Sequence, residues 1–192
     1  MRIFLAGATG VIGIRLIPLL IAEGHVVAGM TRSIAKTDQL RELGAQPVVC
    51  DVFDVETLVQ AVTSFEPDTV IHQLTDLPDR LEDIARFASR NDRIRTEGTR
   101  NLLHAAHQAG ASHFLAQSIA WRPAGRAAVI DNHEEAVLRA GGVVVRYGQL
   151  YGPGTYYENE KPPHPRIHVD EAARATPPLI HHPSGTVTLV EA

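Results

Sequence analysis

Three glycines near the start of the chain have the spacing of a phosphate-binding turn. Gly7, Gly10 and Gly13 follow the apolar run Ile3–Ala6 and precede an amphipathic stretch. Glycine lets the backbone turn tightly and approach a ligand, and the N–H groups that begin the next helix attract a pyrophosphate. A glycine triplet alone also suits an ordinary strand-to-helix turn, but its place between a buried strand and a helix favours the ligand site. The residues predicted to bind a dinucleotide here are Gly7, Thr9, Gly10, Val11, Ile12 and Gly13.

A second chemical signal follows the next predicted strand, where a dinucleotide places its adenosine ribose. Sites for NAD usually carry a carboxylate at this point, which binds the ribose 2′-OH. This chain has Thr31, Arg32 and Ser33 instead, with no acid among them. A guanidinium pairs with a 2′-phosphate, and hydroxyl groups add hydrogen bonds. The segment therefore favours NADP over NAD, the alternative being that Arg32 is a solvated surface residue.

Metal chemistry and thiol chemistry are not expected. The chain has ten histidines. His104 and His107 are three apart and His181 and His182 are adjacent, but no cysteine or carboxylate completes a set with ligand spacing. The single cysteine, Cys50, excludes an internal disulfide and ends an apolar strand, which favours a buried thiol in a reducing compartment.

Bulk composition is that of an ordinary globular domain. The 192 residues suit one domain, residues 1–192, with a full core. The formal charge of −4 and the absence of a basic run argue against nucleic acid or an anionic membrane as partner. No apolar run reaches the ~18 residues of a membrane span. With the single cysteine, these features predict a cytoplasmic protein without a nucleic-acid or membrane partner.

The elements that position these residues alternate between apolar strands and helices. Continuous apolar strands flanked by helices are typical of a parallel sheet covered on both faces, with the ligand at the carboxyl ends of the strands. The predicted fold class is therefore α/β, a doubly wound parallel sheet of the Rossmann type. The predicted strands are Arg2–Ala6, His25–Met30, Pro47–Cys50, Thr69–Gln73, His113–Gln117, Gly142–Arg146 and, at an edge, Thr186–Val190. The predicted helices are Val11–Glu23, Ile34–Leu43, Val55–Phe65, Leu81–Ala109 with a break near Ser89–Asn91, Asn132–Ala140 and Asp170–Thr176.

Further motifs extend the pattern over nearly the whole chain. They are Asp51-Val52 after the third strand, Gly98-Thr99-Arg100-Asn101-Leu102-Leu103, the strand Phe114–Ser118, Arg146 with Tyr151-Gly152-Pro153-Gly154, and His168-Val169-Asp170. With the glycine turn, they resemble the short-chain dehydrogenase/reductase superfamily, in particular its extended or atypical branch of epimerases and dehydratases that act on sugar nucleotides. In that branch residues 151–192 would be a reduced substrate-side region.

The resemblance implies roles for residues that composition alone does not assign. Asp51 and Val52 would hold the adenine ring. Gln73, Leu74 and Thr75 would pass near the ribose and the nicotinamide, with Gln73 narrowing that side. Ser118 would be the catalytic serine. The helical region Leu81–Ala109 corresponds to a face through which related proteins dimerise, so a homodimer is a further expectation.

The chain departs from the family where the chemistry is done. The family uses a Tyr, and a Lys four residues later, as general acid/base on the helix after the fifth strand. Here the corresponding region, Arg126–Glu135, has neither and reads as one helical turn too short. The motif Tyr157-x-x-x-Lys161 runs into prolines and is interpreted as an exposed loop. Arg95 occupies the place of a family asparagine.

Three functions remain open. The first is an NADP-dependent oxidoreductase on a small carbonyl-type substrate, with Ser118 bonding the substrate and a proton from His133, Tyr151 or water. His133 also suits a surface position at a helix N-terminus. The second is a non-catalytic dinucleotide-binding redox sensor or interaction protein. The third is a sugar-nucleotide epimerase or dehydratase, which would need the absent Tyr and Lys.

Overall fold

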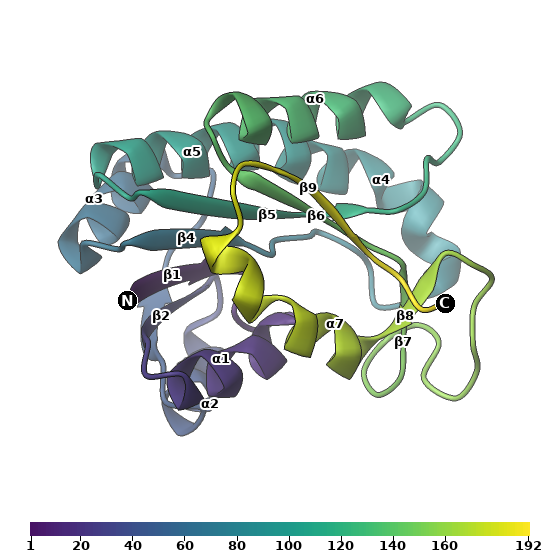
Figure 1. Ribbon diagram of the computed structural model, residues 1–192, viewed down its shortest axis with the longest axis horizontal. Coiled ribbons are helices and arrows are strands. Elements are labelled where there is room, and N and C mark those ends of the chain that lie inside the picture. Colours follow the sequence, from purple (N-terminus) through teal and green to yellow (C-terminus); the bar gives the residue numbers. More distant parts are fainter.

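A seven-stranded parallel sheet forms the centre of the molecule (Figure 1). The computed structural model describes residues 1–192. The strand order is β3-β2-β1-β4-β5-β6-β9, and every neighbouring pair is parallel. This confirms the predicted doubly wound architecture. The strands are β1 (Arg2–Ala6), β2 (Val26–Thr31), β3 (Gln46–Val49), β4 (Thr69–His72), β5 (His113–Ile119), β6 (Val143–Tyr147) and β9 (Gly185–Leu189).

Helices cover both faces of the sheet, which is why its strands are apolar throughout (Figure 1). Side chains alternate along β1, so Ile3 and Leu5 enter one core while Phe4 and Ala6 enter the other. The first core lies under α1 (Gly13–Ala22), α2 (Thr37–Glu42) and α7 (Val169–Ala175). The opposite face carries α3 (Val55–Phe65), α4 (Ile84–Arg93), α5 (Thr99–Gln108) and α6 (Ala127–Arg139).

The strand order reverses at β1, and this reversal positions the predicted site. Ala6, the last residue of β1, pairs with Met30 of β2 and with His72 of β4. The residues that follow these three strands therefore emerge together at the carboxyl edge, where the chain on either side of the reversal leaves a crevice. They begin with Gly7, Arg32 and Gln73.

Two helix predictions were wrong. Helix α6 begins at Ala127, five residues before the predicted start. Ile130, His133, Glu134 and Val137 are its buried residues, and their spacing is helical. The long helical region is interrupted by η3 (Ile94–Gly98), a π-helical turn, rather than near Ser89–Asn91.

The C-terminal segment contains a small sheet that the sequence did not predict. Strands β7 (Gln149–Tyr151) and β8 (Arg166–His168) pair in parallel. Each has three residues, too few for a periodic pattern to be recognised. Short helical turns complete the chain: η1 (Ile34–Lys36), η2 (Leu81–Asp83) and η4 (Pro177–His181). None of the helices has the length and apolar character needed to span a membrane.

Candidate functional site

The glycine turn between β1 and α1 has the geometry of a phosphate cradle. A Cβ on Gly13 would lie 2.3 Å from the Gly7 carbonyl oxygen, so only glycine fits at position 13. Gly7 has a φ of +87° and packs against the backbone of Gln73, where a Cβ would lie 2.6 Å from the carbonyl carbon. The Gly10 N–H bonds the Gly7 carbonyl, whereas the N–H groups of Val11 and Ile12 have no backbone acceptor. These free donors at a helix start fit a pyrophosphate.

The end of β2 presents an arginine to the same crevice. The Thr31 hydroxyl is buried, accepts a hydrogen bond from the Ser33 N–H at 3.2 Å and lies 3.5 Å from the Thr9 hydroxyl. The Arg32 side chain is 51% exposed. Its Nη2 lies 3.7 Å from Oδ1 of Asp76, a residue that follows β4. Arg32 therefore extends toward the chain that follows β4, where it is paired with a carboxylate.

Asp76 is a site residue that sequence reasoning missed. Its carboxylate is 12% exposed and accepts two hydrogen bonds from the Arg90 guanidinium, at 2.6 and 3.1 Å. The Asn91 side-chain oxygen accepts its backbone N–H. Together with Arg32, these contacts link the chain after β2 to α4 across the crevice. No sequence signal identifies the link, because it depends on contacts between segments far apart in the chain.

The Asp51-Val52 pair follows β3 and is anchored by α5. The Asn101 side-chain amide donates a 3.0 Å hydrogen bond to the Val52 carbonyl oxygen. The Asp51 carboxylate accepts from the Phe53 N–H at 3.0 Å. The motif around Asn101 therefore fixes the loop at the expected adenine end, and adenine binding by this pair stays a prediction.

The loop after β4 is held from below by buried amides. The Gln73 side chain turns inward and donates to the Tyr147 hydroxyl at 3.1 Å, so it does not narrow the crevice as expected. Burial raises the pKa of Tyr147 to about 12, despite hydrogen bonds with Thr176 and Gln73. The Gln117 side chain donates to the Leu74 carbonyl oxygen at 3.1 Å. Thr75, one residue on, is exposed.

Ser118 lies at the carboxyl end of β5 with its proton already engaged. The residue is fully buried, and its hydroxyl donates to the Glu134 carboxylate at 2.5 Å. The same carboxylate accepts from Arg146 on β6 and from Arg122 on the loop after β5. Burial alone would raise the pKa of Glu134, but the hydrogen bonds from Arg146 and Ser118 outweigh it and lower this pKa. Glu134 is therefore ionised, and sequence reasoning had not assigned it a role.

His133 is buried, so its expected place at an exposed helix start was wrong. Its Nε2 bonds the Gln117 carbonyl at 3.0 Å, which makes this nitrogen the donor. Its Nδ1 then accepts from the Thr99 hydroxyl at 2.8 Å, and Thr99 in turn lies 3.1 Å from His72 Nε2. Burial, with the nearby Arg95 charge, lowers the pKa of His133 to about 4. A neutral ring with both nitrogens engaged is a packing element joining β4, α5 and α6 rather than a ready proton donor.

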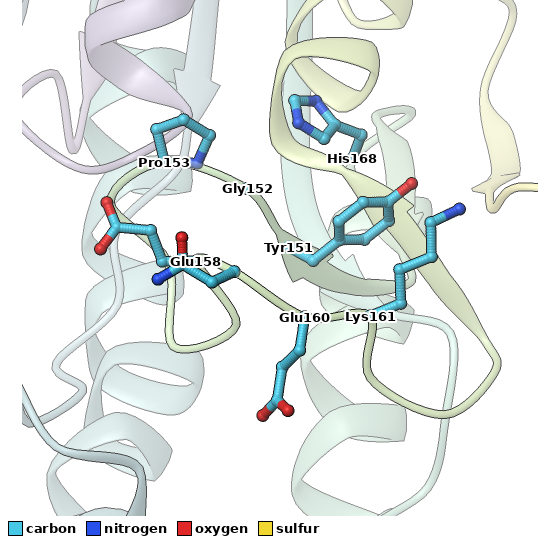
Figure 2. A pocket seen from close by; sticks show the side chains of 8 residues that line it. Tyr151, Gly152, Pro153, Glu158, Glu160, Lys161 and His168 are labelled. Atoms are coloured by element: carbon cyan, nitrogen blue, oxygen red, sulfur yellow. The ribbon is translucent and has the colours of Figure 1, made fainter.

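Tyr151 lies in a second hollow, in the C-terminal segment. The hollow has a volume of about 340 Å³. Figure 2 shows the Lys161 side chain beside the Tyr151 ring, with His168 near the ring's other side. The Lys161 Nζ lies 5.1 Å from the ring centroid, and the Tyr151 hydroxyl donates to Glu191 at 2.6 Å. The hollow is lined by Tyr151, Gly152, Pro153, Glu158, Asn159, Glu160, Lys161 and His168.

The Tyr157-x-x-x-Lys161 motif forms no helix, as the following prolines indicated. Lys161 is exposed, lies in a loop and pairs with Glu191 rather than with Tyr157. The partners of Tyr151 and Lys161 belong to this C-terminal segment, whereas the partners of Ser118 come from α6.

Arg15 joins the C-terminal segment to the glycine turn. Its Nε bonds Asp170 of α7 at 2.6 Å, and its Nη2 bonds the Pro153 carbonyl at 2.7 Å. Its Nη1 bonds the Val11 carbonyl within the turn itself. The Gly152-Pro153-Gly154 segment is thereby held over the start of α1, close to the proposed phosphate position.

Comparison with known proteins identifies the family of the chain. Residues 7–138 match the model of a family described as NAD(P)H-binding. A 3-diazoavenalumate denitrifying reductase from a Streptomyces species is 35% identical over 185 residues, which cover 83% of this chain and 60% of the reductase. The photosystem II assembly factor Ycf39 of Synechocystis is 32% identical over 119 residues, covering 62% of this chain and 34% of that protein. The chain thus spans about 60% or less of the length of these relatives.

Solved structures share the fold. The UDP-glucose 4-epimerase of Thermus thermophilus, in complex with NAD, has a TM-score of 0.80 and 20% sequence identity. The superposition covers 99% of this chain and 78% of the epimerase. At this identity the likeness concerns the arrangement of strands and helices, not the reaction.

Proposed function

Because this chain belongs to the NAD(P)H-binding family, within the short-chain dehydrogenase/reductase-like superfamily, we propose that it is an NADP-dependent oxidoreductase acting on a small carbonyl-type substrate. The observation that carries the proposal is the set of unpaired donors and the arginine at the carboxyl ends of β1 and β2. There the free N–H groups of Val11 and Ile12 would bind the pyrophosphate, and Arg32 would pair with the 2′-phosphate. Gly7, Gly10 and Gly13 would allow the close approach.

Near Ser118 the chain has positively charged arginines, where the family has its general-acid tyrosine. A bound nicotinamide supplies or accepts the hydride. Leu74 and Thr75 would lie along it. Ser118 would bond the carbonyl oxygen of the acceptor by turning its hydroxyl proton from Glu134 toward that oxygen. The Arg122 and Arg146 guanidinium groups place positive charge beside Ser118, which would stabilise negative charge on the acceptor oxygen. Water would then provide the proton.

A non-catalytic role is the second candidate, favoured by the same serine. Ser118 is fully buried and tied to Glu134, and no Tyr and Lys pair stands beside it. A redox sensor or interaction protein would need the crevice but not a free proton donor. The similarity to an assembly factor fits that class. A sugar-nucleotide epimerase or dehydratase ranks third, because its chemistry needs the absent pair.

Turnover with purified protein separates these functions. NADPH absorbance would be followed with a panel of small aldehydes, ketones and quinones, for the wild type, Ser118→Ala and the exposed-serine control Ser112→Ala. We expect at least one acceptor to be reduced, with the rate at least about tenfold lower in Ser118→Ala and unchanged in the control. Tight NADPH binding without turnover on any acceptor would instead support the non-catalytic role.

A further inference from the structure

Arg95 is a buried cation without a partner. It is the second residue of the π-helical turn η3, and its side chain is 5% exposed. Its Nη1 atom has no hydrogen-bond partner in the protein, and the guanidinium forms no ion pair. A buried charge is strongly unfavourable unless it is paired and hydrogen-bonded. The residue therefore calls for a partner that the rest of the fold does not provide.

The backbone around Arg95 is also unusual. π-helical turns are rare, occur mostly as single turns inside α-helices and are frequent at functional sites. Here η3 separates α4 from α5 and packs against α6, the helix that carries Glu134. This packing brings the Arg95 charge close enough to interact with that of Glu134, whose carboxylate bonds the Ser118 hydroxyl.

The acids near Arg95 are committed to other arginines. Its charge interacts with those of Glu134 and Asp92. Glu134 is bonded by Arg122, Arg146 and Ser118, and Asp92 is paired with Arg126. Burial lowers the pKa of Arg95, and the nearby Arg122 charge acts in the same direction. Asp131 is paired with Arg122 as well. Four arginines therefore face three carboxylates in this region, and Arg95 is the one that is buried.

We propose that Arg95 binds a carboxylate of the substrate, beside Ser118 at the carboxyl end of β5. The planar guanidinium fork matches the two oxygens of a carboxylate, and an anion would balance the charge as well as the hydrogen bonds. The inference rests on the proposed oxidoreductase function and narrows its substrate to a small carbonyl-type compound that is also an acid. The half-exposed loop that carries Arg122 lies at this edge and must yield for the acid to enter.

The test compares acids with their neutral amides. Formate, acetate and benzoate would be titrated against formamide, acetamide and benzamide, using protein saturated with NADP and protein without it, and binding would be measured by calorimetry. We expect at least one acid to bind at least about tenfold more tightly than its amide, and Arg95→Met to abolish that difference. Arg95→Lys, which keeps the charge, should restore part of it. Arg100→Met, which removes an exposed arginine five residues away, is the matched control.

Two further readouts keep the proposal separate from a structural role and from the proposed function. Urea unfolding of Arg95→Met should give a midpoint equal to or above that of the wild type, because a buried unpaired charge is removed. A clearly lower midpoint would mean that Arg95 is a structural residue. NADPH affinity should be unchanged in Arg95→Met, so a failure of cofactor binding in the wild type would contradict the proposed function instead. If no acid binds better than its amide, the carboxylate site is wrong.

Discussion

The two halves of the sheet's carboxyl edge treat their polar groups in opposite ways. Near β1 and β2, the N–H groups of Val11 and Ile12 have no backbone acceptor, and the Arg32 side chain is half exposed. Near β5 and β6, Ser118 is fully buried and the Glu134 carboxylate bonds three side chains. The first half keeps donors available for a ligand, whereas the second uses its groups to fix its own geometry. Binding and turnover should therefore respond to different substitutions.

The largest effect is expected from a side chain added to the glycine turn. Gly13→Ala would place a Cβ 2.3 Å from the Gly7 carbonyl oxygen, and neither backbone can move aside without displacing α1. We expect a loss of about 2–3 kcal/mol in the free energy of unfolding and at least about a hundredfold weaker NADPH binding. Urea unfolding and calorimetric titration check both effects.

Gly10→Ala is the matched control for that prediction. Its Cβ would meet only the Gly7 carbonyl oxygen, at 3.3 Å, and otherwise faces open space. This variant should fold nearly as stably as the wild type and still bind NADPH poorly. If it bound as well as the wild type, the phosphate would not lie at this turn.

In the second half, removing the Glu134 charge should lower the stability of the fold much more than the affinity for NADPH. Glu134→Gln leaves Arg146 and Arg122 without their shared carboxylate. Both guanidinium groups are about one-third exposed, so we expect a loss of about 2–4 kcal/mol, at the low end for a broken buried pair. NADPH affinity should change by less than about threefold. A large loss of affinity with intact stability would contradict the division between the halves.

The buried histidines of the second half should make stability depend on pH. The pKa of His133 falls from an ordinary 6.5 to about 4 on folding, so the unfolded chain binds its proton first. The resulting stability is complete above pH 6.5 and is lost as the pH falls toward 4, by up to about 3 kcal/mol. Urea unfolding at several pH values should show a smaller loss in His133→Gln than in the exposed control His107→Gln. Equal slopes would mean that His133 titrates normally in the folded protein.

In the first half, Asp76 competes for the arginine assigned to the cofactor. Asp76→Asn removes the carboxylate that both Arg32 and Arg90 contact. With these guanidinium groups freed, NADPH should bind about three- to tenfold more tightly, while NADH should change less. Fluorescence titration of both cofactors checks this. Weaker NADPH binding would show that Asp76 holds Arg32 in its productive position.

The smallest effect is expected outside both halves. Lys161 is exposed, lines the C-terminal hollow and forms an ion pair with Glu191. Lys161→Ala should leave NADPH affinity and any turnover within about twofold of the wild type. A tenfold loss of turnover would instead indicate that the reaction takes place beside Tyr151, in the C-terminal hollow.

Local signals predicted much of the fold. The bounds of β1 and of α3 were predicted as observed. An apolar run marks the first, and the structure shows that Asp54 caps the second through the Thr57 N–H. The glycine turn was equally readable, since strand, turn and helix adjoin in sequence. The start of α6 was misjudged because no side chain caps its first turn. Which of its residues face the core is seen only in the packed structure.

The contacts that define the site could not be predicted from the sequence. The Arg32–Asp76 pair, the Ser118–Glu134 bond and the His72–Thr99–His133 chain each join segments that are far apart in sequence or lie on different elements. Residue type suggested Ser118 and Arg32, but not the partners that decide whether their groups are free. Arg95 was noticed as an unexpected residue, and only its burial without a partner gave it a meaning.

Calorimetric titration of NADPH and NADH into the wild type and Arg32→Ala tests the central claim most directly. If the open half of the edge is an NADP site, the wild type binds NADPH at least about tenfold more tightly than NADH. Arg32→Ala should then remove this preference by weakening NADPH binding alone. Equal affinity of the wild type for both cofactors, or an unchanged preference in Arg32→Ala, would contradict the account.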